Sequence, residues 1–281
     1  MKDILILDCA EVKCPLVLLY VFIELCQAFT DRSYTVKVVN NIKEITNNSI
    51  VFIGDDFKIN NIGALLNNIA PEAIYIGWYW HNQNTTQLKY FIHTYENMLN
   101  PDKRVLFLKE QKKNCPLLLR ASENPACVGT YKKNIQYDFC YMGARYCPHL
   151  VPGAPFKGIY HGVDDWELFL PYNKRKDIYL ASIFALGFQA DENIANKHVS
   201  QRIFEGLAYG CIVLTNSMPA CEQTNHIAVY ISSQKELEDQ MYFYKANPVL
   251  LEEKQKAGYA FIKKYGTNHN AIDLFMECIN I

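Results

Sequence analysis

The stretch 200–215 constrains the fold more than any other part of this chain, because it reads as a helix that runs directly into a buried strand. Apolar residues recur at helical spacing up to Gly210, and glycine commonly ends a helix in a left-handed turn. The apolar run Cys211–Leu214 that follows is typical of a strand buried on both faces, as in a parallel sheet. The pattern therefore predicts one helix and one strand of an α/β layer.

Polar side chains near the start of this predicted helix point to a chemistry. Ser200, Arg202 and Glu205 are grouped there. An Arg can pair with phosphate, a helix N-terminus attracts anions, and a carboxylate can accept hydrogen bonds from both hydroxyls of a ribose. The group could therefore grip a nucleotide sugar. The alternative is structural, because Arg202 and Glu205 are three residues apart and could form a surface pair or a buried salt bridge with each other.

Two motifs resemble those of glycosyltransferases with the GT-B fold. In that family the nucleotide-binding helix usually reads Glu-Ala-x-Ala-x-Gly and precedes a hydrophobic strand, as the stretch 200–215 does here in variant form. Upstream, His-Gly-Val-Asp at 161–164, with Phe169 and Pro171, resembles the Asn-Gly-Val-Asp…Phe-x-Pro junction that opens the C-terminal domain. The variant Ser-x-Arg-x-x-Glu, followed by Gly-Cys-Ile, is closer to the spore-coat-type (Glyco_trans_1_2-like) and exostosin-like branches. The resemblance covers residues 158–270.

The resemblance implies an α/β fold of two Rossmann-like domains (GT-B) facing each other across a cleft. It implies an N-terminal acceptor-binding domain over residues 1–160 and a nucleotide-sugar-binding domain over 161–265. A C-terminal helix over 266–281 would cross back to the first domain. The residues agree with this layout, because predicted strands alternate with predicted helices, which favours a doubly wound parallel sheet.

The hydrophobic pattern also predicts the individual elements. Strands are expected at 4–7, 34–39, 50–53, 73–78, 104–108, 177–184, 211–215 and 228–231. Helices are expected at 15–29, 60–68, 85–99 and 200–209, after the capping box Ser233-x-x-Glu236, and from Asn247 to Gly266.

The resemblance implies that the protein moves a sugar from a nucleoside-diphosphate donor to an acceptor hydroxyl, with the donor as substrate and no cofactor. Ser182 is expected at the end of a strand, where a small residue lets backbone approach phosphate. Lys197 stands eight positions before Glu205, where many retaining members carry another Glu, so retention or inversion of configuration stays open. The donor nucleotide-binding candidates are Ser182, Lys197, His198, Ser200, Arg202 and Glu205.

Two of these candidates carry specific roles in the resemblance. The guanidinium of Arg202 would neutralise the leaving diphosphate as its charge grows. Glu205 would accept hydrogen bonds from the ribose hydroxyls, so Glu205→Ala is expected to weaken nucleotide binding with little loss of stability.

The acceptor side has candidates in the first half of the chain. Trp80 and His81 follow the strand expected at 73–78, and aromatic faces stack on sugar rings. Asp8 and Glu11 follow the first strand, where some inverting enzymes of this fold place a general base. The catalytic candidates are Arg202, His81, Glu11 and Asp8.

The composition of the chain limits which acceptors and metal ions, and which cellular location, are expected. The formal net charge of -1 gives no electrostatic bias towards nucleic acid, so the expected acceptor is a glycan, lipid-linked or protein-linked group and not a nucleic acid. No Asp-x-Asp motif occurs and the ten cysteines form no Cys-x2-Cys pair, so a metal-independent enzyme is expected. The longest apolar run, 15–23, is too short to span a bilayer, and no secretory signal is evident. A cytoplasmic protein with free thiols is therefore expected.

Two alternatives remain open from the sequence. One is a sugar-nucleotide epimerase or phosphorylase built on the same pair of α/β units. The other is a non-catalytic homologue that binds a nucleotide sugar but transfers nothing, which Lys197 at the position of the expected Glu makes worth considering.

Overall fold

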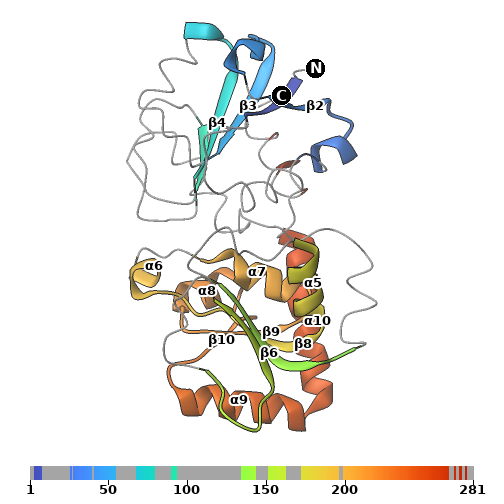
Figure 1. The fold of residues 1–281 in the computed structure, drawn as a ribbon, viewed down its shortest axis with the longest axis vertical. Helices are drawn as coiled ribbons and strands as arrows, with labels where there is room; N and C mark the ends of the chain where they lie inside the picture. Colours follow the sequence, from blue (N-terminus) through green and yellow to red (C-terminus); the bar gives the residue numbers. More distant parts are fainter. Residues whose placement is uncertain are drawn as a thin grey trace. The chain divides into compact units, whose positions relative to one another are not determined.

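Two compact units make up the chain in a computed structural model, which describes residues 3–7, 26, 28–39, 41–54, 68–79, 90–93, 134–143, 151–162, 172–195, 199–265, 269, 272–273 and 276. The first unit comprises Met1–Leu117 and Ala271–Ile281, and the second comprises Leu118–Asn270. Each unit contains a five-stranded parallel sheet (Figure 1).

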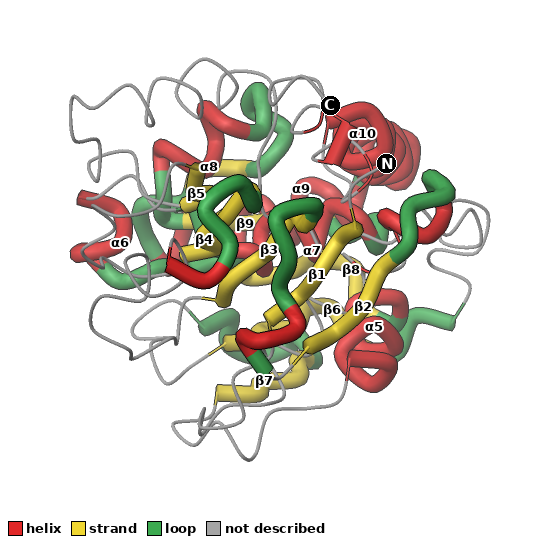
Figure 2. Tube along the Cα trace, turned by 90° about the horizontal axis from the view of Figure 1, so that it is seen from above, coloured by secondary structure: helices red, strands yellow, loops and turns green. Residues whose placement is uncertain are grey.

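The first sheet has the order β2-β1-β3-β4-β5, with every neighbouring pair parallel (Figure 2). Its central strands are rich in β-branched residues, and Ile4, Ile50 and Val51 are fully or almost fully buried, as expected for a sheet covered on its faces. The elements are β1 (Asp3–Leu7), β2 (Val36–Val39), η1 (Ile42–Glu44), β3 (Ser49–Gly54), β4 (Ile74–Tyr79) and β5 (Tyr90–His93).

The second sheet has the order β10-β9-β8-β6-β7 and is likewise parallel throughout. Its strands are β6 (Tyr137–Gly143), β7 (Gly158–Gly162), β8 (Ser182–Leu186), β9 (Ile212–Thr215) and β10 (Val229–Tyr230). The helices of this unit are α5 (Tyr172–Leu180), α6 (Asp191–Ala195), α7 (Gln201–Ala208), α8 (Met218–Gln223), α9 (Gln234–Ala246) and α10 (Pro248–Tyr265).

The two sheets share one strand order. In each, the first strand along the chain lies between the second and the third, and the fourth and fifth follow outward. The direction in which strands are added therefore reverses between β1 and β3 in the first sheet and between β6 and β8 in the second. In open α/β sheets ligands bind beyond the carboxyl ends of the strands at this reversal point. A ligand site in the second unit is therefore expected at the carboxyl ends of β6 and β8.

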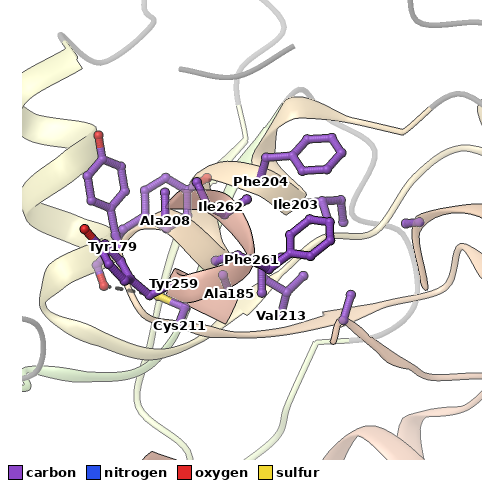
Figure 3. Packing of buried hydrophobic residues seen from close by; sticks show 14 of the residues in the cluster. Tyr179, Ala185, Ile203, Phe204, Ala208, Cys211, Val213, Tyr259, Phe261 and Ile262 are labelled. Atoms are coloured by element: carbon purple, nitrogen blue, oxygen red, sulfur yellow. Dashed lines mark hydrogen bonds between the residues drawn. The ribbon is translucent and has the colours of Figure 1, made fainter. Parts of the chain in front are cut away.

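Side chains of the second sheet alternate between two cores. Val213 packs with α7, α5 and α10, whereas Leu214 packs with α9 on the opposite face. The sheet accordingly lies between α9 on one side and α7 and α8 on the other (Figure 1). Figure 3 shows the core on the α7 side, where Ile203, Phe261 and Val213 lie close together. This packing fixes α7 against the sheet.

Most predicted elements in the described residues are confirmed, but two are wrong. The helix expected over 85–99 contains strand β5, because its aromatic and β-branched run Tyr90–His93 pairs with β4 and extends the sheet. The strand expected over 177–184 is helix α5 up to Leu180 and strand β8 only from Ser182. The strand at 104–108 and nearly all of the helices at 15–29 and 60–68 lie outside the described residues.

The expected boundary at 160/161 also requires correction. Strands β6 and β7 precede it, yet both pair within the second sheet, so the second unit begins at Leu118. The cause is the weak hydrophobic periodicity of this part of the sequence. The segment Ala271–Ile281 belongs to the first unit, where Asp273 forms a salt bridge with Arg32. Among the described residues, no helix has the length and apolar character that crossing a membrane requires.

The close approach of α7 to the sheet predicts an unusual effect of a helical glycine. A Cβ on Gly206 would lie 2.8 Å from Val213 Cγ2 and 2.9 Å from Ala185 Cβ. Alanine normally stabilises a helix relative to glycine by about 1 kcal/mol. Here Gly206→Ala should instead destabilise the protein by about 1–3 kcal/mol, because Ala185 Cβ cannot move without its backbone. Urea unfolding measures the change.

Gly258→Ala in α10 is the matched control. Its Cβ would meet Leu207 Cδ2 at 2.9 Å, which is the end of a side chain that can rotate away. The substitution should therefore be close to neutral or stabilising. Equal losses for the two variants would contradict the tight contact at Gly206.

Candidate functional site

Helix α7 begins and ends as its sequence predicts. Ser200 is the N-cap residue with extended backbone, and Gly210 has φ 69°, the left-handed conformation that glycine adopts readily. Cys211 N donates to Gly206 O (2.8 Å) and Gly210 N to Leu207 O (3.1 Å). These two bonds form a Schellman motif, which turns the chain sharply from α7 into β9.

Arg202, in the first turn of α7, spans the reversal point of the second sheet. Its Nη1 donates to the hydroxyl of Tyr141 on β6 (2.8 Å) and to the carbonyl of Phe188, which follows β8 (3.2 Å). The guanidinium also lies against Gly143, the last residue of β6, since a Cβ there would be 2.3 Å from Nη1. A positive charge is thus held at the carboxyl ends of β6 and β8, where the fold places ligands.

The loop after β8 is held by side chains from the neighbouring strand end. Thr215 Oγ1 donates to Gly187 O (2.8 Å), and Gly187 N donates to Leu214 O (2.8 Å). Asn216 Oδ1 accepts from Gln189 N (2.8 Å) while its Nδ2 donates to Gln189 O (2.9 Å). Asn216 thereby imitates a strand neighbour, and the ladder of bonds continues past the end of the sheet.

The start of α7 is capped in an unusual way. Ser217 and Ser233 each accept a hydrogen bond from a backbone N–H in the first turn of α8 and α9. Ser200 makes no such side-chain bond. Its own N–H instead donates to Gln189 Oε1 (2.8 Å). Among the described residues, the side chain of Ser200 therefore gives α7 no cap, and the first-turn N–H of Ile203 donates to Ser200 O (3.0 Å) instead. A helix N-terminus favours an anion.

Glu205 is buried and forms an ion pair, but with a residue that the sequence did not indicate. Its Oε2 accepts from Arg175 Nη2 (2.7 Å) and from the hydroxyl of Tyr179 (3.1 Å), both on α5. The Glu205 residue is 2% exposed and the Arg175 residue 7%. The expectation that Glu205 would pair with Arg202 if it were structural is wrong, because the two side chains leave α7 in different directions.

The electrostatics of this cluster favour a charged pair. Burial lowers the pKa of Arg175, but the Glu205 carboxylate and Tyr179 outweigh this effect, so the pKa of Arg175 lies above its ordinary value. Burial, together with the charge of Glu205, raises the pKa of Tyr179 well above its ordinary value. Arg175 thus stays ionised and Tyr179 stays protonated at neutral pH. Because removal of one member of a buried ion pair strongly destabilises a protein, Glu205→Ala is expected to cost stability, contrary to the expectation from the sequence.

Ser182 lies at the wrong end of its strand for a ligand. It begins β8 instead of ending a strand, is completely buried, and its Oγ donates to Ile178 O (2.7 Å). The carboxyl end of β8 is four residues further on, at Leu186. The expected position of Ser182 was wrong because the preceding residues belong to α5.

The remaining sequence-derived candidates fall outside the described residues. They are Asp8, Glu11, Trp80, His81, Lys197 and His198. Conversely, no sequence pattern indicated Arg175, which reads as part of a solvated basic run, or Gln189 and Asn216, which stand in no recognisable spacing. Of the candidates that are described, Ser200 and Arg202 lie together at the start of α7, and Glu205 lies one turn further into the core.

Comparison with known proteins identifies the family. Residues 126–277, more than half of the chain, match the family model described as glycosyl transferase-like. The chain therefore belongs to the glycosyl transferase-like family. A search of curated proteins found no significant match.

Solved structures share the fold. An alpha-glucosyltransferase in complex with UDP and a 13-mer DNA containing an HMU base matches with a TM-score of 0.64 and 9% identity, over 100% of both chains. The beta-glucosyltransferase of T4 phage matches with a TM-score of 0.59 and 15% identity, also over 100% of both chains. An alpha-glucosyltransferase in complex with UDP-glucose and DNA containing an abasic site has a TM-score of 0.62 and 10% identity, over 100% of this chain and 99% of the other.

These matches define the class of protein. The fold is GT-B, with two Rossmann-like parallel sheets. The protein is a glycosyltransferase, and its reaction is the transfer of a sugar from a nucleotide-sugar donor.

The buried ion pair predicts a large stability effect. Glu205→Ala should destabilise the protein by about 3–5 kcal/mol, because it leaves the charge of Arg175 buried without its carboxylate. The double variant Arg175→Met/Glu205→Leu should recover most of this loss, since it removes both charges together. Urea unfolding of the single and double variants tests both expectations.

Glu252→Ala is the control, because Glu252 pairs with Lys256 on the surface of α10 at 2.7 Å with both side chains more than half exposed. Its effect should stay within about 0.5 kcal/mol. A Glu205→Ala effect as small as that of Glu252→Ala would mean that the ion pair does not hold α7 in place.

Proposed function

We propose that the protein is a hexosyltransferase that uses a uridine diphosphate sugar, with the diphosphate bound between Arg202 and the N-terminus of α7. The observation that carries the proposal is the position of Arg202 at the reversal point between β6 and β8. The alpha-glucosyltransferases with the same fold are recorded in complex with UDP and with UDP-glucose, which supports a uridine nucleotide and a hexose.

The chemistry of sugar transfer accounts for the groups at this site. Negative charge grows on the leaving diphosphate as the glycosidic bond breaks, and donors aimed at that charge lower the barrier. Arg202 supplies a permanent positive charge and the first turn of α7 supplies backbone N–H groups and its dipole. These groups can stabilise the leaving diphosphate themselves, so we propose that the enzyme needs neither a metal ion nor a cofactor.

The contribution of the other donor candidates is part of the proposal. Ser200, whose side chain caps no backbone N–H, is available to a phosphate oxygen beside Arg202. Lys197 and His198 stand just before α7 in the sequence and are proposed to contact the same diphosphate. Glu205 is only 2% exposed, so the ribose hydroxyls of a donor have little access to its carboxylate. We therefore propose that Glu205 acts mainly by holding α7 in position.

The acceptor is proposed to be a hydroxyl on a glycan, a lipid-linked group or a protein. Trp80 and His81 are proposed to bind it, with Asp8, Glu11 or His81 as general base. The net charge of -1 supports an acceptor that is not a nucleic acid. Complexes of the structural relatives do contain DNA, one with an HMU base, so DNA with a hydroxymethylated base belongs in the acceptor screen as a separate arm. The free thiols of Cys26 and Cys221 support a cytoplasmic location.

The rival activities of the same fold differ in their products. An epimerase would convert the donor sugar without an acceptor, and a phosphorylase would consume phosphate. A binding-only homologue would release no nucleoside diphosphate from the donor at all. Mass analysis of the products formed from UDP-hexoses with and without acceptors separates these activities from transfer.

Substitution of Arg202 tests the proposal. Arg202→Ala should slow release of UDP from the donor by about 100-fold or more, because the lost charge acts mainly in the transition state. Arg202→Lys should restore the rate only in part, since an ammonium is a point charge and cannot form a paired fork of hydrogen bonds with the diphosphate. Steady-state kinetics and calorimetric binding of UDP and uridine provide the measurements.

Lys256→Ala removes an equal charge from the surface of α10 and serves as the control. It should leave kcat and the affinity for UDP unchanged. If Arg202→Ala weakened binding of uridine and UDP by the same factor, the guanidinium would not act on the diphosphate.

Removal of metal ions should leave the activity intact. If the cation and the helix N-terminus stabilise the leaving group, the turnover of the enzyme treated with EDTA should match that of the untreated enzyme. Loss of activity in EDTA, followed by recovery on addition of Mg²⁺ or Mn²⁺, would contradict the metal-independent part of the proposal.

A further inference from the structure

We propose that the side-chain amide of Gln189 is a phosphate-binding group of this site, donating a hydrogen bond from Nε2 to an oxygen of the donor diphosphate. This inference rests on the proposed function of the site. Gln189 lies in the loop between β8 and α6, next to the start of α7.

The side chain of Gln189 is buried, and only the oxygen of its amide makes a hydrogen bond within the described residues. Gln189 is 4% exposed, and its Oε1 accepts a hydrogen bond from Ser200 N (2.8 Å). Within the described part of the chain, its Nε2 has no hydrogen-bond partner. Leaving a buried donor unpaired costs free energy, and buried polar groups in native proteins nearly always have a partner. The arrangement is explained if a ligand supplies the acceptor.

The amide cannot turn to satisfy itself. Rotation by half a turn would place the NH₂ group against the N–H of Ser200, so that two donors would face each other. The backbone of Gln189 is held on both sides by the Asn216 side chain, through bonds of 2.8 and 2.9 Å. Both ends of the residue are thereby fixed, and Nε2 keeps its position at the start of α7.

The surrounding groups determine the kind of ligand. Nε2, the first-turn N–H groups of α7 and the Arg202 guanidinium are all hydrogen-bond donors. A ligand that satisfies them together must offer several acceptor oxygens, and a charged one gains from the guanidinium and the helix dipole. A diphosphate has this chemistry, whereas a neutral nucleoside does not.

Gln189→Glu is the direct test, because glutamate keeps the oxygen that accepts from Ser200 N and replaces only the donor. Loss of a hydrogen bond to a charged group should raise the Kd for UDP by about 10- to 100-fold. The Kd for uridine should change by less than about twofold, because the nucleoside lacks the phosphate oxygens. Isothermal titration calorimetry with UDP and uridine gives both values.

Gln189→Met removes the donor without adding a charge, and it also removes the oxygen that accepts from Ser200 N. It has a similar length and is neutral, and it should also raise the Kd for UDP relative to uridine by about tenfold. An effect of Gln189→Glu without any effect of Gln189→Met would mean repulsion at a distance and would overturn the proposal. The melting temperature of each variant reports whether the fold is retained.

Gln255→Glu is the matched control. Gln255 in α10 is 2% exposed, and its Nε2 likewise has no partner among the residues described. Gly258, three residues further on, lies against Leu207 near the end of α7 that is opposite Ser200. Gln255→Glu should lower the stability but leave the ratio of the UDP and uridine Kd values unchanged.

The outcomes distinguish this inference from the function on which it rests. If the unmodified protein bound UDP no more tightly than uridine, the proposed diphosphate site itself would fail. If it bound UDP more tightly and the two Gln189 variants kept that preference, only the role of Gln189 would be overturned.

Discussion

The ion pair between Arg175 and Glu205 is the interaction on which the position of helix α7 depends. It joins α5 to α7 in the interior, where the attraction between the two charges is weakly screened. Any rotation of α7 about its axis would separate the carboxylate from the guanidinium in an interior where water could not solvate the two charges, which would cost free energy. Because α7 is fixed in this way, Arg202, less than one turn earlier, is held towards β6 and β8 and not towards solvent.

The groups of the proposed donor site are held in place by contacts within the protein. Asn216, which follows β9, holds the loop after β8, and this loop holds Ser200, the N-cap residue of α7. Arg202 in α7 in turn donates to Phe188 O in the same loop. These hydrogen bonds link the end of β9, the loop after β8 and the start of α7 to one another, so a shift of any one of these segments would break bonds to another. A ligand that binds to such a site spends little of its interaction energy on ordering the protein, and more is available to stabilise the leaving group.

The sequence predicted the features whose causes are local. The helical spacing of the stretch 200–209 and the left-handed turn at Gly210 depend on residues within one or two turns, and the structure confirms both. The partner of Glu205 depends on a residue 30 positions away on another helix, and no spacing rule encodes such a contact. Likewise, the apolar pattern around strand β5 fits a helix or a strand, and only its pairing with β4 decides between them. All four acceptor-side candidates, Asp8, Glu11, Trp80 and His81, lie outside the described part of the chain.

The first unit is assembled from both ends of the chain, whereas the second is continuous. During synthesis the ribosome therefore completes every strand of the second unit before it has made Asp273, which pairs with Arg32. The N-terminal unit is the last to be finished, in reverse of the order in which domains usually fold as they emerge. A premature stop codon that removed only the segment Ala271–Ile281 from the chain would consequently damage the unit that is translated first.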